Sequence, residues 1–327
     1  MDAFATTDGI RKDFSNINNA IDYIAGIEKT DEDIHAVPST DVKFHGGELI
    51  IAGNAMPVTC TAYQQILTKI GIPSSFVKRC PNNLMAVNIR KMLKEHNKTP
   101  WRIRTRLDVD GERYVRAVVT EKYKPLIDSD VLTRARDDSK DISNDPWDIK
   151  FSDDAMRATK TLDDTMHPTA DVGDITKAGV EIINGTTGQV KFSIGMFLYR
   201  LVCSNGLVVP ERMAGMSKRH IGSEFYNSYS ESFYNILDAI DTVSTKWGAI
   251  SQSTIQDARS AVINSSRLAT EAIIGRKETR DIFDEQVNAS STVYTLMNII
   301  TARAKSIDDI IARRSLESAG GILLLAA

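Results

Sequence analysis

The segment 101–119 constrains the fold more than any other part of this chain. Its first half alternates apolar and basic residues, and in a strand the basic ones share one face: Arg102, Arg104 and Arg106. Asp110–Gly111 then supplies a dipeptide that is typical of a two-residue type I′ turn. The cross-strand pairs that this loop predicts are Leu107 with Tyr114 and Ile103 with Val118. We therefore expect an antiparallel hairpin with one apolar and one arginine-rich face.

The segment 197–209 predicts a second buried feature. Its apolar run is followed by Asn205–Gly206 and then by Leu207–Val209, which indicates a core segment that doubles back through a tight turn at Asn205–Gly206. Arg200 interrupts the run. Because a guanidinium stays charged, Arg200 needs a carboxylate, a phosphate or access to water.

The remaining patterns predict an α+β class, with an antiparallel β-rich body, short N-terminal helices and a helical C-terminal third. Hydrophobic residues recur at helical spacing after Ser223, and the aromatic members of that series favour a core position over a base-stacking one. We expect a helical or flexible segment over 1–40, a core over 41–222 and a helical region over 223–327. An acidic, solvated insertion is expected around 137–175.

Charge is distributed unevenly along the 327 residues. The net charge is −3, which gives the whole protein no attraction to nucleic acid. Residues 76–124, however, hold thirteen Lys and Arg against five Asp and Glu, whereas residues 125–181 hold seven against fourteen. The three cysteines have no metal-binding spacing and suggest reduced, cytoplasmic thiols, and no apolar run is long enough to span a membrane.

Three stretches carry a family resemblance: Val115–Pro125, Phe192–Val209, and Arg219–His220 with Gly222. Together they resemble the uncharacterised phage/plasmid-like proteins, a domain-of-unknown-function family of phages, plasmids and integrated elements. The resemblance implies a phage-encoded protein in the cytoplasm of a bacterial host, and it supplies no activity. Its structural core motif falls on Arg200, Cys203, Asn205, Gly206 and Gly222. The chain departs from the family at Asn184–Gly188, where the family often has an acidic residue.

Basic residues around the first hairpin are the candidate nucleic-acid contacts. Arginines at alternate strand positions lie ~6.6–6.8 Å apart, which approximates the phosphate spacing of an extended single strand. The alternatives are a solvated sheet face, or arginines neutralised by the Asp-rich segment that follows. For His220 the alternative is a positioning role through a backbone carbonyl. The candidates are Arg102, Arg104, Arg106, Arg113, Arg116, Lys122, Lys124, Lys218, Arg219 and His220.

The leading hypothesis is a non-enzymatic DNA-metabolism protein that binds single-stranded DNA through this arginine-lined face, as an annealing or recombination accessory. The C-terminal helices would pack or mediate homo-oligomerisation. One alternative is a host-interaction protein that uses the acidic segment 125–181 to dock on a bacterial protein. Another is a metal-independent enzyme that uses Arg200 and His220. The sequence has no metal, nucleotide-hydrolysis or nucleophile motif, so we expect no catalytic residue, metal or cofactor.

Overall fold

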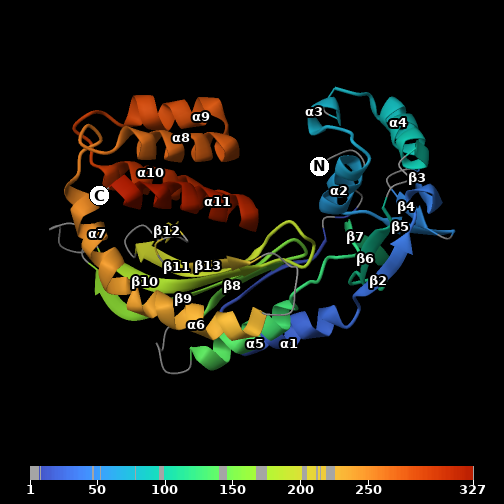
Figure 1. The fold of residues 1–327 in the computed structure, drawn as a ribbon, viewed down its shortest axis with the longest axis horizontal. Coiled ribbons are helices and arrows are strands. Elements are labelled where there is room, and N and C mark those ends of the chain that lie inside the picture. The colour runs from blue at the N-terminus through green and yellow to red at the C-terminus, as the bar shows by residue number, and fades with distance from the viewer. Residues whose placement is uncertain are drawn as a thin grey trace.

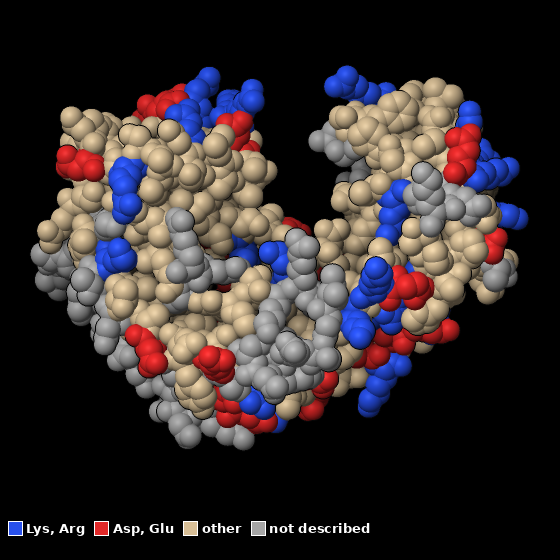
Figure 2. Space-filling model, in the orientation of Figure 1, with Lys and Arg blue, Asp and Glu red and all other residues tan. Residues whose placement is uncertain are grey.

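The computed structural model describes residues 7, 9–45, 48–51, 53–77, 79–95, 99–139, 146–166, 175–200, 205–210, 213, 215–218 and 225–326. They form an α+β fold whose sheets are antiparallel, which confirms the predicted class. Figure 1 shows two lobes, a large lobe (residues 9–28 and 128–326) and a small lobe (residues 32–120). An open cleft separates α8–α11 of the large lobe from α2–α4 of the small lobe (Figure 2).

A seven-stranded sheet forms the centre of the large lobe. The strand order is β1-β8-β9-β10-β11, and β12 and β13 both pair with β11. The strands are β1 (Arg11–Phe14), β8 (Asp148–Ser152), β9 (Met156–Met166), β10 (Thr176–Asn184), β11 (Phe192–Arg200), β12 (Asn205–Val208) and β13 (Gly215–Lys218). Alternate residues of β9, β10 and β11 point to opposite faces, so each face has its own chemistry.

Helices cover both faces of this sheet (Figure 1). Below it lie α1 (Ile17–Glu28), α5 (Asp128–Asp138) and α6 (Phe225–Asp238). Above it lie α8 (Ser260–Ile274), α10 (Val293–Ala304) and α11 (Ile310–Gly321). The remaining elements are α7 (Ile240–Gln252), α9 (Arg276–Arg280), a π-helical turn (Asp281–Gln286) and a 3₁₀ helix (Ile322–Ala326). The lower face is mainly apolar, with Lys160 as a buried charged residue on it, whereas the upper face carries several polar and charged residues.

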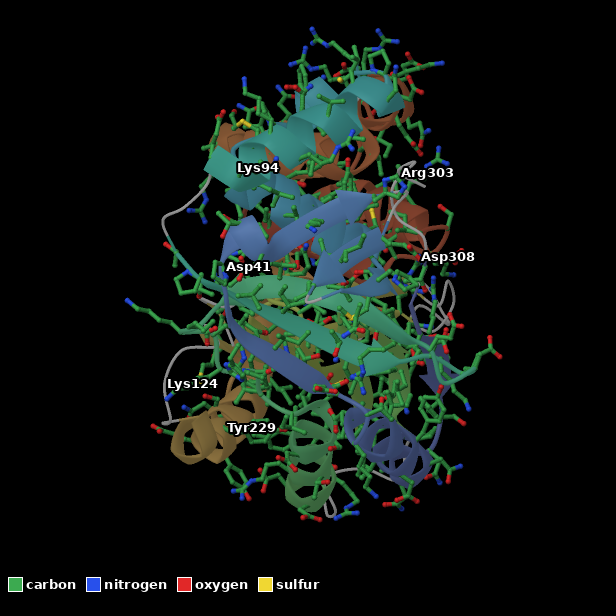
Figure 3. All side chains as sticks on the ribbon, turned by 90° about the vertical axis from the view of Figure 1, so that its right-hand side faces the viewer. Asp41, Lys94, Lys124, Tyr229, Arg303 and Asp308 are labelled. Carbon is green, nitrogen blue, oxygen red and sulfur yellow. The ribbon has the colours of Figure 1, made fainter. Side chains whose placement is uncertain are left out.

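The small lobe contains two three-stranded sheets with helices packed on them. One sheet is β2 (Glu32–Val37), β6 (Trp101–Leu107) and β7 (Arg113–Thr120). The other is β3 (Val42–His45), β4 (Glu48–Ile51) and β5 (Asn54–Pro57). The helices are α2 (Cys60–Lys69), α3 (Ser74–Val77) and α4 (Asn82–Glu95), with a 3₁₀ turn (Ser39–Asp41). Figure 3 views this lobe from outside, with Lys94 of α4 near the top.

Local signals explain where α2 begins and ends. Thr59 has an extended backbone and its Oγ1 accepts a hydrogen bond from the amide of Ala62 at 3.2 Å, so it caps the helix. Gly71 follows the last turn with a φ of +77°, a conformation that favours glycine. The buried face of α2 then carries Tyr63 and Ile66 into the small-lobe core.

The core layout differs from the predicted segmentation. One core joins α1 to residues 131–324, and a second core holds residues 37–118. The small lobe is therefore inserted between α1 and α5. The expected acidic insertion is wrong for residues 146–166, because β8 and β9 lie inside the large-lobe sheet with Ile149 and Phe151 fully buried. Residues 140–145 and 167–174 lie outside the described residues.

The predicted hairpin is present, but its loop and half of its register differ from the prediction. Ile103 pairs with Val118 as expected, whereas Leu107 pairs with Arg113 and not with Tyr114. A bulge in β7 causes the shift, because Thr105 pairs with Val115 and Arg104 with Ala117, which leaves Arg116 as the extra residue. The loop is also longer than two residues, since the amide of Asp108 donates to the carbonyl of Glu112 at 2.8 Å.

The second predicted core segment also doubles back. Strand β12 pairs with β11, and Arg200 is opposite Asn205. The predicted turn position is wrong, because Asn205 and Gly206 already belong to the returning strand; residues 201–204 lie outside the described residues. Arg200 stacks over the ring of Tyr294 at 5.4 Å. In the C-terminal third, Tyr229 and Phe233 are buried, which confirms the predicted core position for these two aromatics, whereas Tyr234 is 56% exposed and the prediction is wrong for it.

The N-terminus of α5 contains a buried acid, Asp128, that makes the stability of the protein depend on pH. Asp128 is fully buried and accepts a hydrogen bond from Nδ2 of Asn184 at 2.7 Å. Burial, reinforced by the nearby charge of Glu28, raises the pKa of Asp128 to about 7. The folded state then holds the proton more tightly than the unfolded state, so this group costs stability as the pH rises from about 4 to about 7.

We expect Asp128→Asn to raise the free energy of unfolding by about 1–3 kcal/mol at pH 8 and to have little effect near pH 4. Oδ1 of Asn184 has no hydrogen-bond partner among the described residues and can accept from an amide at position 128. Urea unfolding at pH 4.5, 6 and 8 measures the effect. Asp130→Asn, an exposed change on the same helical turn, is the control. Parallel pH profiles for Asp128→Asn and the parent protein would contradict the prediction.

Candidate functional site

The predicted arginine face is the joint between the two lobes. Arg104 and Arg106 of β6 and Arg116 of β7 point toward the turns that end the large-lobe hairpins β8–β9 and β10–β11. Arg102 extends the same row at the edge of the joint. The β7 bulge brings Arg116 into this row. Because these turns belong to the large lobe and the strands to the small lobe, the arginines link the lobes.

Three aspartates pair with these arginines, and the set of seven residues is named the joint network here. Asp31 accepts two hydrogen bonds from Arg106, at 2.6 and 3.0 Å, and one from Arg116 at 2.8 Å. Asp33 pairs with Arg102 at 2.8 Å and Arg104 at 2.9 Å. Four guanidinium groups thus face three carboxylates at close range.

Asp153 connects the joint network to the large lobe. It lies in the turn between β8 and β9, and its Oδ1 accepts from Arg106 at 2.7 Å. Its Oδ2 accepts from the hydroxyl of Tyr114 and from the amide of Ile10, the latter at 3.1 Å. Arg116 also donates to the backbone carbonyl of Asp153 at 3.1 Å. Both carboxylate oxygens are therefore occupied, by donors from β6, from β7 and from the residue before β1.

Burial rules out these arginines as a phosphate-binding face. Arg104 is 5% exposed, Arg106 0% and Arg116 1%. Burial alone would raise the pKa of Asp31, but Arg116, Arg106 and Arg104 outweigh it and lower the pKa. The expected open arginine face is therefore wrong. The arginines are neutralised, as the alternative predicted, but Asp153 alone comes from the Asp-rich segment that follows the hairpin, whereas Asp31 and Asp33 precede the hairpin in sequence.

The other predicted contacts are scattered. Arg113 pairs with Glu32 at 3.2 Å, and Lys122 and Lys124 are exposed beyond the end of β7. Figure 3 shows Lys124 at the outer edge of the molecule. Lys218 belongs to β13. The following candidates lie outside the described residues: Cys203, Arg219, His220 and Gly222.

The upper face of the large-lobe sheet offers a different candidate site. A pocket of about 470 Å³ lies there between α11 and strands β8 to β12 and is named the sheet groove here. This volume is within the range of small-ligand sites. Four cations and two carboxylates line it, together with two aromatic and two threonine side chains: Lys150, Arg157, Lys177, Arg313, Asp148, Glu317, Phe197, Tyr199, Thr159 and Thr161.

A second ion network holds α11 against the groove. Arg157 of β9 donates from Nε to Glu181 at 2.7 Å and from Nη2 to Glu317 of α11. Arg314 of α11 donates to the other oxygen of Glu181 at 2.8 Å, and Arg313 donates to Glu317 at 3.2 Å. Arg157, Glu181 and Glu317 are each less than 5% exposed. The wall formed by α11 is therefore fixed by charged hydrogen bonds.

The groove combines charge with aromatic surface. Phe197 and Tyr199 alternate on β11 with ring centroids 6.2 Å apart, and the guanidinium of Arg157 lies 5.4 Å from the Phe197 ring. Nη1 of Arg157 has no hydrogen-bond partner among the described residues. Lys150 reaches Asp13 of β1 at 3.1 Å. Such an arrangement suits a ligand that has a planar part and an anionic part.

Sequence reasoning did not find the sheet groove. Its residues come from segments that are more than 150 positions apart, and each is unremarkable in its own segment. The available signal was the spacing of Phe197 and Tyr199 within the predicted core segment, whereas Thr159 and Thr161 fell in the segment predicted as an acidic insertion. Without the strand order, that signal does not place these residues side by side.

Metal and membrane features are absent from the part of the chain that the structure describes. No group of three or more His, Cys, Asp or Glu side chains there could hold a metal ion. No helix among the described elements is long and apolar enough to cross a bilayer. No protein-family model, curated protein or solved structure matches the chain, so the family resemblance stays a prediction.

Proposed function

We propose that the chain is a non-enzymatic protein that binds single-stranded DNA in the sheet groove. The observation that carries the proposal is the lining of that groove, where four cations and two carboxylates share a pocket with the rings of Phe197 and Tyr199. Single strands expose both phosphates and unstacked bases, and proteins bind them by pairing a cationic groove with aromatic platforms. The open cleft beside the groove gives a strand room to enter (Figure 2).

The biological setting of the proposal rests on the resemblance. A phage or mobile-element protein of this kind would act in the cytoplasm of the bacterial host as an annealing or recombination accessory. The arginine row has no part in this binding, because its guanidinium groups are buried in the joint network. The proposed binding site is therefore the upper face of the large-lobe sheet and not the small-lobe hairpin.

Groove variants test the proposal by fluorescence polarisation with labelled single- and double-stranded oligonucleotides across a salt series. We expect Tyr199→Ala to weaken single-strand binding by about 1–3 kcal/mol, the usual contribution of one stacked base. Lys150→Ala should weaken binding. It should also reduce, by about one, the slope of the logarithm of the binding constant against the logarithm of the salt concentration. Lys12→Ala is the matched control, because Lys12 lies on the neighbouring strand β1 but contacts Phe14 and Tyr23 on the opposite face.

A second comparison separates the groove from the surface first predicted. Lys122 and Lys124 are exposed and lie outside the groove, so the double change Lys122→Ala, Lys124→Ala should leave affinity unchanged. The proposal fails if the parent protein does not bind oligonucleotides at low salt. It also fails if the double change weakens binding while Tyr199→Ala and Lys150→Ala do not.

A further inference from the structure

A second pocket lies at the base of the cleft, where the two lobes meet. It has a volume of about 620 Å³ and is lined by α2, by the end of β7 with Tyr123, and by the loop of the β10–β11 hairpin. Figure 1 shows this hairpin reaching toward the small lobe. The pocket is named the joint pocket here. It shares no lining residue with the sheet groove.

The charge of the joint pocket is unbalanced. Lys69 and Lys191 line it, and no Asp or Glu does. Neither lysine forms an ion pair with a described carboxylate, although most other described basic residues near the joint do. Burial lowers the pKa of Lys69, and the carbonyls at the end of α2 provide only partial compensation for its charge. A half-buried cation without a counter-charge is stabilised by an anion that binds beside it.

The rest of the lining supplies neutral hydrogen-bonding groups on a rigid frame. Gln65 accepts from the amide of Val118 at 2.7 Å and donates to the carbonyl of Thr187 at 2.8 Å, so it fastens α2 to both lobes. The hydroxyl of Tyr123 donates to the carbonyl of Gly185 at 3.0 Å. Amide and hydroxyl groups at the mouth complete the set: Gln64, Thr68, Thr120 and Gln189.

We propose that the joint pocket binds a phosphate ester of about nucleotide size. The two lysines would neutralise the phosphate, and the amides and hydroxyls would hydrogen-bond the polar groups of its organic part. Val119, Val190 and the ring of Tyr123 supply an apolar wall for that part. Phosphate is preferred to carboxylate because two ammonium groups on opposite lobes match a doubly charged anion. Ligand binding there would also tighten the joint, since both lobes contribute to the pocket.

Isothermal titration calorimetry tests the proposal with adenosine monophosphate and with inorganic phosphate as probes, at constant ionic strength in sodium chloride. We expect saturable binding of adenosine monophosphate to the parent protein, weakened at least tenfold by Lys69→Met and by Lys191→Met. Lys94→Met is the control, because Lys94 is exposed on α4 of the same lobe (Figure 3). The methionine keeps the apolar stem of lysine, and Lys69→Met should leave Tm unchanged or raise it, because it removes a half-buried charge.

The outcomes separate this pocket from the sheet groove. Loss of adenosine monophosphate binding in Lys69→Met with unchanged oligonucleotide affinity assigns the pocket to a free phosphate ester. Loss of both adenosine monophosphate binding and oligonucleotide affinity in Lys69→Met assigns the pocket to a phosphate of the bound strand. Either of these two results supports a phosphate site in the joint pocket. Tyr199→Ala should leave adenosine monophosphate binding intact, so this pocket stands if the groove proposal fails. The inference is overturned if neither probe binds at millimolar concentration, or if Lys69→Met and Lys94→Met bind alike.

Discussion

Replacing Asp153 by asparagine should lower the free energy of unfolding by about 3–5 kcal/mol, the usual cost of removing one partner from a buried ion pair. Oδ1 of Asp153 accepts a hydrogen bond from Arg106 and lies 3.3 Å from Nε of Arg116, and Oδ2 accepts from Tyr114 and Ile10. An asparagine must turn its amino group toward one of these sets of donors. Either choice leaves a buried donor facing another donor. Arg106, which is fully buried, is then left with Asp31 as its carboxylate partner.

Urea unfolding of Asp153→Asn against the parent protein measures this effect. Asp110→Asn is the matched control, because Asp110 is exposed in the β6–β7 loop and surface changes of this kind stay within about 0.5 kcal/mol. Comparable stability of the two variants would show that the joint network contributes little to folding. A two-step unfolding curve for Asp153→Asn would instead indicate that the lobes separate before they unfold.

The same argument decides which variants can report on DNA binding. A triple change of Arg102, Arg104 and Arg106 to alanine removes both partners of Asp33, leaves Asp31 with Arg116 alone, and takes the closest cation from Asp153. Such a protein is expected to be strongly destabilised, so weaker DNA binding by it would reflect unfolding. Tyr199 and Lys150 are better positions for this test, because both are partly exposed and outside the buried ion networks.

The sequence predicted the local elements well because their signals are local. The β6–β7 hairpin and the buried aromatics Tyr229 and Phe233 of α6 both depend on residues that are close together in sequence. The arrangement of those elements depends on contacts between distant segments. The acidic stretch near 148 looked solvated because its charges are frequent, yet in β8 they alternate with Ile149 and Phe151 and face away from the lower core.

The arginine row shows why the site itself was not predictable. Alternation correctly placed three arginines on one strand face, but it could not say what covers that face. The covering carboxylates come from positions 31, 33 and 153, about 50 to 75 residues away in sequence. A solvated face, a DNA-binding face and a buried ionic joint give the same pattern of residues. The strand order of the large lobe, which brings the β8–β9 turn to this face, distinguishes them.

The ion network that holds α11 against the sheet groove should also contribute strongly to stability. Glu181→Gln should destabilise the protein by about 3 kcal/mol at pH 7, because it leaves Arg157, Arg313 and Arg314 with Glu317 as the carboxylate of this network. Glu271→Gln is the control, since its partner Arg276 is 90% exposed and surface pairs contribute about 0–1 kcal/mol. Urea unfolding at several pH values measures both variants.

The loss of stability in Glu181→Gln should depend on pH. Burial opposes ionisation of Glu181, but Arg314 and Arg157 outweigh it and lower the pKa below the ordinary value of 4.5. The unfolded state therefore takes up the proton first, so the stability that Glu181 contributes is complete above about pH 5 and is lost as the pH falls through the lower, folded-state pKa. The deficit of Glu181→Gln should shrink below pH 4. A deficit that stays constant with pH would mean that folding does not change the pKa of Glu181, which would contradict the prediction.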